Sequence, residues 1–379
     1  MIYLDNSATT FIKPREVIKS TIEGINNFCA NPGRSGHKLS MIAGEKVFDV
    51  RNNLCNFLNA DKPENIIFTQ NCTDALNLAI LGTSVKGGHV ICSCNDHNSL
   101  IRPLFELQKQ GIIEVSIATP KDGKCLTSED IEPLIKPNTY LIAINHVSNV
   151  NGDYADIQSI GNLCAKRCIL FLVDGAQSVG HIKIDMLSQH IDMLTLAPHK
   201  GLYALQGIGV LALSVRANPK PIRYGGTGTE SINMYQPSDY PECLESGTVA
   251  TPNIISLGAG LKFVRQNFNA INRKIDDLAT YVLFELDKIP NVITYTAPEN
   301  IHHGVIGFNV ETLDSGECAR ILSENYDICV RGGLHCAGVK HKALKTIEQG
   351  VVRVSLSYFN NYTECENFVK AIKKIAKNY

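Results

Sequence analysis

Seven short apolar runs between residues 66 and 213 constrain the fold of this chain most strongly. Taken together they do not alternate with polar residues, which is typical of strands buried on both faces of a sheet. Helical periodicity at Thr73–Leu81 and Ile157–Lys166 separates some of them. This alternation predicts an α/β domain with a mostly parallel sheet. The runs are Ile66–Phe68, Val90–Cys92, Ile112–Ile117, Tyr140–Ile144, Ile169–Val173, Met193–Leu196 and Ile208–Leu213.

The remainder of the chain has a different pattern. Prolines and the run Gly225–Gly228 oppose long regular elements between residues 216 and 252, and a connection of this length is usually functional. A helical pattern then runs from Ile254 through Leu286. Short strands near 292–295, 305–310, 328–330 and 351–355, with a final amphipathic helix, predict a second, smaller α+β domain.

Composition excludes several classes of protein. The net charge of −1 over 379 residues gives no electrostatic support for binding nucleic acid or an acidic membrane surface. We find no apolar run long enough to span a membrane and no secretory signal, so we expect a cytoplasmic protein. The thirteen cysteines form no evident disulfide framework and no zinc-site spacing, so we expect mostly inert thiols and no metal.

Polar residues that follow the strands carry the chemistry, because ligands of parallel sheets lie beyond the carboxyl ends of the strands. Asp174 lies in Val173-Asp-Gly-Ala-Gln177, and Lys200 follows His199 after another strand. Asn71 and Asn145 also follow strands. Each residue alone has a structural explanation, since an aspartate here is often a helix N-cap and a lysine often only reaches water.

A cysteine later in the chain differs from the others by its context. Cys336 lies in Arg331-Gly-Gly-Leu-His-Cys336, whose glycines predict a mobile or tightly turned loop. A thiol needs exposure and nearby positive charge to ionise near neutral pH. Arg331, His335 and Lys340 are the local candidates for that charge.

Three further residues extend this set. The segment Phe68–Ala75 predicts a strand, a turn and a helix with Thr73 as its N-cap. The start of this helix either binds a phosphate group or is an ordinary capped helix end. His97 is positioned to stack on an aromatic cofactor and carry protons, or is an ordinary surface histidine. Arg353, alone within a strand, suits a substrate carboxylate or an internal salt bridge.

The order of these groups favours one chemistry. An amine, a carboxylate and a thiol are what a pyridoxal-phosphate enzyme acting on sulfur needs. The amine forms the Schiff base, the carboxylate keeps the pyridine nitrogen protonated, and the thiol takes the sulfur.

These motifs resemble those of the class V aminotransferase family, and within it the group II cysteine desulfurases, which include Suf-type enzymes and selenocysteine lyase-like relatives. The resemblance runs nearly from end to end, and the Arg-x-Gly-x-His-Cys-Ala pattern is specific to group II. The matching segments are Tyr3–Thr9, His146–Asn149, Val173–Gln177, His199-Lys200, Glu245–Thr248, Arg331–Ala337 and Arg353.

The resemblance implies fold type I of the pyridoxal-phosphate-dependent transferases, which is aspartate-aminotransferase-like. The large domain, with its seven-stranded sheet, would be 15–253, and the small domain 1–14 with 254–379. It also implies a homodimer with pyridoxal 5'-phosphate as cofactor. The resemblance implies that Lys200 forms the Schiff base, Asp174 pairs with the ring nitrogen, Gln177 contacts the phenolic oxygen, and His97 stacks on the ring. It implies that the phosphate is bound by Cys72, Thr73 and His199, and that Thr248 reaches the phosphate of the neighbouring subunit. Asn149 would place substrate and cofactor, Arg353 would hold the substrate carboxylate, and Cys336 would receive the sulfur.

The implied reaction converts L-cysteine to L-alanine and leaves a persulfide on Cys336, which passes to a sulfur-acceptor protein or a reductant. His97 and Lys200 would carry the protons. Alternatives are a selenocysteine lyase or cysteine sulfinate desulfinase, another class V aminotransferase or lyase, and a non-enzymatic relative. Cys72 and Ala197 stand where the family often has threonine and serine. The loss of two hydroxyl donors would weaken cofactor binding, by about 1 kcal/mol for each hydrogen bond.

Overall fold

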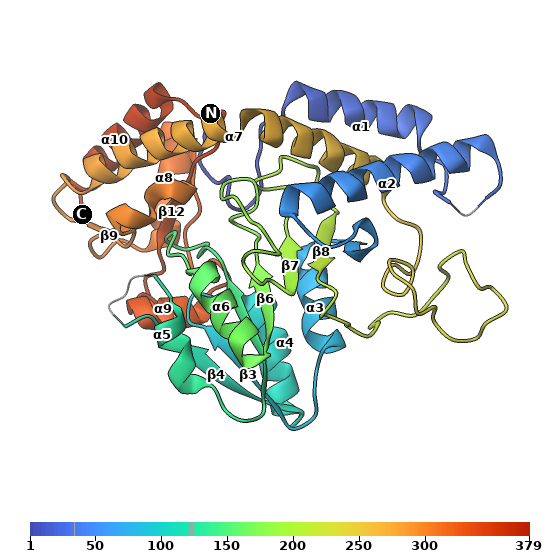
Figure 1. The fold of residues 1–379 in the computed structure, drawn as a ribbon. Coiled ribbons are helices and arrows are strands. Elements are labelled where there is room, and N and C mark those ends of the chain that lie inside the picture. The colour runs from blue at the N-terminus through green and yellow to red at the C-terminus, as the bar shows by residue number, and fades with distance from the viewer. Residues whose placement is uncertain (34, 122–124) are drawn as a thin grey trace.

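A seven-stranded sheet forms the centre of the molecule in this computed structural model, which describes residues 1–33, 35–121 and 125–379 (Figure 1). The strand order is β2-β8-β7-β6-β5-β3-β4, and β8 is antiparallel to both of its neighbours while the other pairs are parallel. The predicted mostly parallel sheet is therefore confirmed. Its strands are β2 (Ile66–Thr69), β3 (Gly88–Ser93), β4 (Ile113–Ala118), β5 (Thr139–Asn145), β6 (Leu170–Asp174), β7 (Met193–Leu196) and β8 (Gly209–Leu213).

Helices cover both faces of this sheet, which explains why its central strands lack polar alternation. Ile142 and Val173 pack into a core with α2 (Lys38–Leu58), α6 (Ile157–Arg167) and part of α7 (Thr251–Leu286). Alternate strand residues pack on the other side against α3 (Cys72–Gly82) and α4 (Asn98–Lys109). The two helices predicted within this region, α3 and α6, are confirmed to within one residue at each end.

The prediction that all seven strands are buried is wrong for β4. This strand lies at the edge of the sheet and pairs only with β3. Glu114 and Ile117 within it are exposed. An edge strand has one free side and is only partly covered, so polar residues are tolerated there.

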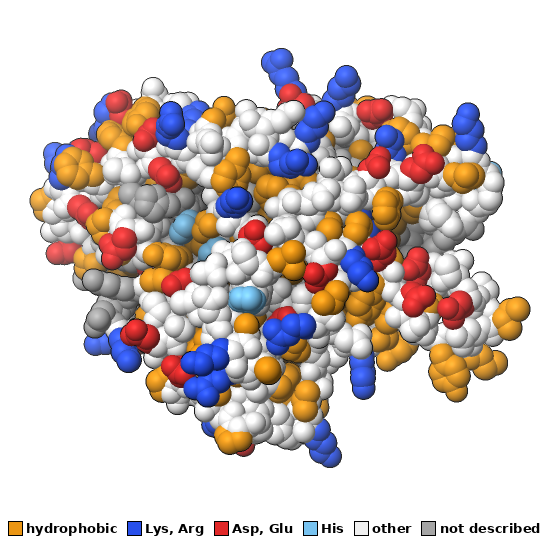
Figure 2. Space-filling view, in the orientation of Figure 1, with side chains coloured by type: hydrophobic (Ala, Val, Ile, Leu, Met, Phe, Trp, Pro, Cys, Tyr) orange, Lys and Arg blue, Asp and Glu red, His pale blue; other side chains and the backbone are white. Residues whose placement is uncertain are grey.

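The segment between β8 and α7 contains no helix or strand, which agrees with the predicted lack of long regular elements, although α7 begins at Thr251 and the segment therefore ends at residue 250 rather than at the expected 252. Figure 1 shows this yellow segment projecting from the body of the molecule beyond α2. Figure 2 shows hydrophobic side chains gathered on the projection. Ile232 and Met234, which belong to this segment, are 99% and 98% exposed.

The C-terminal region forms a second core around an antiparallel sheet of order β12-β10-β9, in agreement with the predicted α+β region. The N-terminal strand β1 (Ile2–Tyr3) pairs with β11 (Ile328–Cys329), so the first residues join the C-terminal part. Helix α7 contributes side chains to both cores, and the boundaries of the two domains stay a prediction. The other strands are β9 (Val292–Thr294), β10 (Val305–Val310) and β12 (Val352–Ser355), and the other helices are α1 (Arg15–Asn27), α5 (Ser128–Ile131), α8 (Ser315–Tyr326), α9 (Gly338–Leu344) and α10 (Tyr362–Ile375), with short 3-10 turns η1 (Pro63–Asn65), η2 (Glu132–Leu134) and η3 (Pro298–His303).

None of the helices in the described ranges combines the length and the apolar character that crossing a bilayer requires. Among the same residues, no group of three or more histidine, cysteine, aspartate or glutamate side chains is arranged to hold a metal ion.

Candidate active site

A cavity of about 130 Å³ lies where the carboxyl ends of the parallel strands meet. Its walls come from the segments that follow β2, β3, β5, β6 and β7. Eight residues that were given a role from the sequence line it together. Asn71 and Asn145, which also follow strands, line it as well, so the predicted convergence beyond the strand ends is observed. The eight residues are Cys72, Thr73, His97, Asn149, Asp174, Gln177, His199 and Lys200.

Asp174, the last residue of β6, supplies a buried carboxylate to this cavity. Its Oδ1 accepts a hydrogen bond from the backbone N–H of Ala176 (3.0 Å) and lies 3.7 Å from Sγ of Cys72. No helix begins in the turn that follows, so Asp174 is not an N-cap. Burial raises the pKa of Asp174, because the charged form loses hydration, and a cationic partner in the cavity would stabilise the carboxylate.

Lys200 lines the same cavity, and burial lowers the pKa of its amine. An amine with a lowered pKa is neutral more often and is therefore a better nucleophile. Close backbone approach shapes the turn around it: a Cβ atom on Gly201 would lie only 2.2 Å from the carbonyl oxygen of Val179. The glycine after the lysine is thus required by packing.

The N-terminal segment covers the outer side of this turn. Both the backbone N–H (3.1 Å) and the hydroxyl (2.9 Å) of Thr10 donate to the carbonyl oxygen of His199. The amine of Lys13 contacts Thr10 Oγ1 at 2.7 Å. Gln177 donates from its side chain to the carbonyl oxygen of Ser7 (3.1 Å). The first residues of the chain therefore form part of the structure of the site.

The start of α3 differs from the sequence prediction in one residue. Asn71, not Thr73, is the N-cap: its backbone is extended and its side chain accepts a hydrogen bond from the N–H of Asp74 (3.0 Å). Thr73 is instead the second residue of the helix, and its hydroxyl lies 2.8 Å from the hydroxyl of Ser99. The hydroxyl of Thr73 and the first N–H groups of the helix are consequently available beside the cavity, an arrangement that suits an anion such as phosphate.

His97 is the N-cap of α4, and its Nδ1 accepts a hydrogen bond from the backbone N–H of Ser99 (3.1 Å). This contact assigns the ring proton of the neutral side chain to Nε2. Burial, assisted by the charge of Lys200, lowers the pKa of His97 to about 4. The ring that lines the cavity is therefore neutral at pH 7. Ser99, which links His97 to Thr73, was not identified from the sequence.

Cys336 is exposed on a tight loop next to this cavity. His335 and Cys336 both have left-handed backbone conformations, with φ of 49° and 56°, which cost energy in residues other than glycine. The carbonyl oxygen of Cys336 accepts a hydrogen bond from the N–H of Asn98 (2.7 Å), one residue after His97. The loop is therefore joined to the segment that carries His97.

The prediction that three positive groups promote ionisation of Cys336 is wrong for two of them. The imidazole of His335 is buried against the carbonyl oxygen of Val351 (2.8 Å), and desolvation lowers its pKa to about 3, so it is neutral. Lys340 is also buried, and its amine forms an ion pair with Asp153. Arg331, which is half-buried, is the remaining candidate of the three.

Arg353 forms the internal salt bridge that was its structural alternative. It is 1% exposed, and its Nη2 lies 2.5 Å from Oδ1 of Asp5. Its Nη1 donates to the carbonyl oxygen of Asn149 (2.9 Å). Its Nε has no partner within the described residues. The Nε–H of the guanidinium group is therefore an unused donor, and the role of Arg353 toward a substrate stays a prediction.

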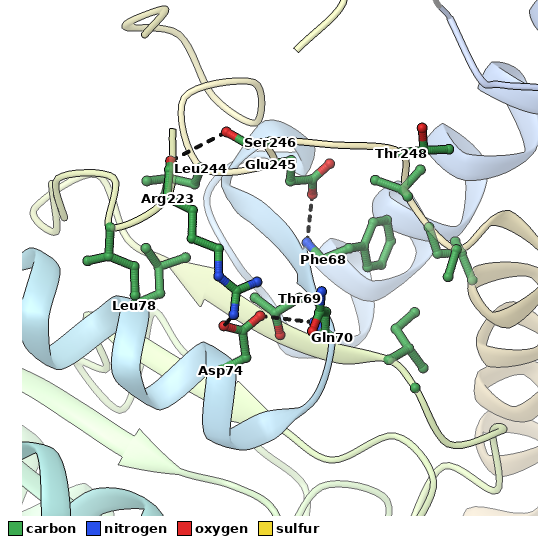
Figure 3. Close-up of a pocket in the computed structure, with 16 residues that line it drawn as sticks. Phe68, Thr69, Gln70, Asp74, Leu78, Arg223, Leu244, Glu245, Ser246 and Thr248 are labelled. Carbon is green, nitrogen blue, oxygen red and sulfur yellow. Dashed lines mark hydrogen bonds and ion pairs between the residues drawn. The ribbon is translucent and has the colours of Figure 1, made fainter. Parts of the chain in front are cut away.

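Thr248 is exposed and lines a different cavity from the one around Lys200. Figure 3 shows it at the side of this second cavity opposite Arg223, which pairs with Asp74. The carboxylate of Glu245 accepts a hydrogen bond from the N–H of Phe68 there (2.6 Å). Within one chain, Thr248 is thus separate from the eight residues of the site.

Comparison with known proteins agrees with this geometry. The family model of aminotransferase class-V matches residues 2–368. A protein of Methanothermobacter thermautotrophicus named probable cysteine desulfurase is 30% identical over 383 residues, covering 99% of this chain and 94% of its own. One of the same name from Pyrococcus abyssi is 32% identical over 388 residues, covering 100% and 95%. The solved apo structure of cysteine desulfurase from Thermococcus onnurineus NA1 has a TM-score of 0.92 at 31% identity, covering 100% of this chain and 95% of that one.

Proposed function

Because this chain belongs to the class V aminotransferase family, with the architecture of fold type I, we propose that it is a pyridoxal 5'-phosphate-dependent cysteine desulfurase. It converts L-cysteine to L-alanine and holds the released sulfur as a persulfide on Cys336. The observation that carries this proposal is that Lys200 and Asp174 line one cavity together, with the exposed Cys336 on an adjoining loop. Relatives named cysteine desulfurase that match the whole chain support it.

The residues around the cavity fit the cofactor. The buried Asp174 carboxylate accepts hydrogen bonds from a backbone N–H and a thiol but has no fixed cation in direct contact among the ion pairs of the described residues, so a protonated ring nitrogen would complete its environment. Nδ1 of His199 is buried without a partner in the described part of the chain. Lys200 would bind the cofactor covalently, and Gln177 would meet its phenolic oxygen. When bound, the cofactor acts as an electron sink for the substrate α-carbon.

Phosphate binding would depend on the first turn of α3. Thr73 offers its hydroxyl and the helix end offers backbone N–H groups. Cys72 stands where the family often has threonine, and its thiol is directed to Asp174. Burial keeps the pKa of this thiol well above its usual value, so it remains a donor to the carboxylate. A phosphate contact of Cys72 would therefore use its backbone N–H.

In the reaction, Lys200 Nζ accepts the α-proton of the substrate, and Asn149 orients the substrate. Arg353 holds the substrate carboxylate. The thiolate of Cys336 attacks the substrate sulfur, so an S–S bond forms while the C–S bond breaks. The electron pair of that bond stays with carbon, which takes a proton from Lys200 or His97 and becomes the methyl group of alanine. Cysteine and the enzyme thiol thus give alanine and the enzyme persulfide, with atoms and electrons balanced.

The assembly we propose is a homodimer in which Thr248 of each chain reaches the phosphate of the other. Thr248 is exposed and lies outside the Lys200 cavity of its own chain, and the segment between β8 and α7 carries the exposed apolar side chains of Ile232 and Met234. Both features support this arrangement. A sulfur-acceptor protein would collect the persulfide sulfur. The thirteen cysteines are all free thiols, which supports a reducing compartment such as the cytoplasm.

Mass spectrometry of the peptide that contains Cys336, after incubation of the cofactor-loaded protein with cysteine, tests this function. We expect a gain of one sulfur atom there and release of alanine. Cys168, which is also exposed, should remain unmodified and serves as the internal control. A keto acid product would instead identify an aminotransferase. If the Cys336→Ala variant remains active on cysteine, the persulfide route is excluded. If that variant is active on selenocysteine but not on cysteine, the protein is a selenocysteine lyase. Lys200→Ala should abolish the visible absorbance of the bound cofactor.

A further inference from the structure

A buried ion pair lies behind the Cys336 loop and has no part in the reaction described above. The amine of Lys340, on α9, is 2.5 Å from Oδ2 of Asp153 and 2.8 Å from Oδ1 of Asn95. The three side chains are between 2% and 4% exposed. The other carboxylate oxygen of Asp153 accepts from the side chain of Asn300 (2.8 Å). Both charges are therefore satisfied away from water.

The partners of Lys340 belong to the two segments that carry other site residues. Asn95 lies two residues before His97, and its carbonyl oxygen accepts from the side chain of Asn145 (2.6 Å), at the end of β5. Asp153 closes the turn that contains Asn149, through a hydrogen bond from the N–H of Ser148 to its carbonyl oxygen (2.7 Å). Lys340 itself is four residues after Cys336. One amine thus links the segments of Cys336, His97 and Asn149.

The loop that carries the thiol needs such an anchor. His335 and Cys336 hold left-handed conformations, which persist in residues with a Cβ atom only where surrounding contacts enforce them. On its N-terminal side the loop is held by Asn149, whose side chain donates to the carbonyl oxygen of His335 (2.8 Å). On its C-terminal side, Lys340 makes the charged contact. Loss of that contact would let the loop relax and move the sulfur relative to His97.

We propose that Lys340 is a positioning residue for Cys336: its contacts with Asp153 and Asn95 hold the thiol at a fixed place relative to His97 and the cavity. This inference rests on the proposed function, because it assigns a part in sulfur transfer to the loop. Lys340 acts through Cys336 and does not touch the substrate. Its removal should slow transfer of sulfur to Cys336 and leave the affinity for cysteine unchanged.

The test separates positioning from general stabilisation. Lys340→Met removes the charge and keeps the length of the side chain, but it leaves Asp153 buried without a cation. The double variant Lys340→Met with Asp153→Asn removes both charges, which often restores stability where loss of one partner does not. Lys342→Met, on the exposed side of α9, is the matched control. Lys340→Arg keeps the charge and is the conservative variant.

Two measurements are made on the cofactor-loaded protein: single-turnover persulfide formation over a range of cysteine concentrations, and hydrogen exchange of the amides in 331–339 without substrate. In the Met and double variants we expect a maximal rate lower by about tenfold or more, KM within about twofold of wild type, and faster exchange. Lys340→Arg should recover part of the rate, and Lys342→Met should match wild type.

The proposal would be overturned if the double variant had the same thermal midpoint, the same rate of persulfide formation and the same rate of amide exchange as the wild type. A higher KM at an unchanged maximal rate would overturn it as well. If the Met variants do not fold, Asn95→Ala removes one neutral partner and no charge, and should change both readouts in the same direction by about threefold. Unchanged readouts there would overturn it as well. Exchange is measured without cysteine, so absence of persulfide in the wild type would refute the proposed function while this measurement still tests the loop.

Discussion

The side-chain amide of Asn149 donates a hydrogen bond to the backbone carbonyl oxygen of His335 across 2.8 Å. Asn149 follows β5 of the central sheet, whereas His335 immediately precedes Cys336. The backbone carbonyl oxygen of the same asparagine accepts from Nη1 of Arg353 (2.9 Å). One residue therefore connects the sheet, the thiol loop and the buried arginine.

Substitution Asn149→Ala should slow persulfide formation by about tenfold. It leaves the buried carbonyl of His335 without its side-chain donor, which costs roughly 1–3 kcal/mol, and about 1.4 kcal/mol corresponds to a factor of ten in rate. Single-turnover mass spectrometry of the Cys336 peptide measures the effect. Asn162→Ala, on the exposed side of α6, is the control and should not alter the rate. Equal rates in the two variants would show that the contact has no part in sulfur transfer.

Substitution Asp174→Asn should lower turnover by at least about a hundredfold, since it removes a buried charge that a protonated ring nitrogen would pair with. The side chain keeps its size, so we expect the variant to retain bound cofactor. The turnover number with cysteine and the cofactor absorbance check both points. Asp49→Asn, on an exposed position of α2, is the matched control. Near-normal turnover in the Asp174 variant would remove this residue from the chemistry.

Substitution Gly201→Ala should destabilise the protein by about 1–3 kcal/mol, the usual cost of overpacking. The new Cβ atom would lie 2.2 Å from the carbonyl oxygen of Val179, so the turn around Lys200 would have to shift. Gly226→Ala is the control, because a Cβ atom at Gly226 meets nothing within 4 Å. Urea unfolding of both variants, with the cofactor content of each, measures the difference. Equal stability of the two would contradict the close packing at Gly201.

Stability should fall in mild acid because several histidines are buried in neutral form. Burial lowers the pKa of His146 to about 4 from 6.5. The unfolded chain therefore binds a proton on this residue at a higher pH than the folded chain does. Its contribution is fully present above pH 6.5 and is lost as the pH falls toward 4, at about 1.4 kcal/mol per pH unit. Burial lowers the pKa of His97, His181 and His199 to about 4 as well.

Substitution His146→Gln isolates one of these groups outside the cavity of Lys200. Unfolding free energies measured by denaturant titration between about pH 6 and 4.5 should depend on pH less steeply than in the wild type, by about one bound proton. His190→Asn is the control, since His190 is exposed and asparagine tolerates its left-handed backbone. An identical slope in His146→Gln and wild type would mean that this histidine is protonated in the folded state.

Elements with a strong local pattern were predictable. The seven apolar runs match the seven strands of the sheet, and α3 and α6 match their periodic segments closely. We did not predict α2, although its buried residues Val47, Val50, Leu54 and Leu58 have helical spacing. Nor did we predict α4, which contains Pro103. Thr73 and Asn71 are both good N-cap residues, and only the extended backbone at Asn71 distinguishes them.

The sequence alone determined the order of the strands along the chain and the polar residues that follow them, because short-range patterns of apolar residues and turns encode both. That order suffices to bring Asp174 and Lys200 to one cavity, since parallel strands end at the same edge of a sheet. Only the tertiary structure decided how buried charges pair. Arg353 meets Asp5 across 348 positions, and Lys340 meets Asp153 across 187. No local pattern specifies such partners, because desolvated charges pair with whichever opposite charge the packing of distant segments brings within reach.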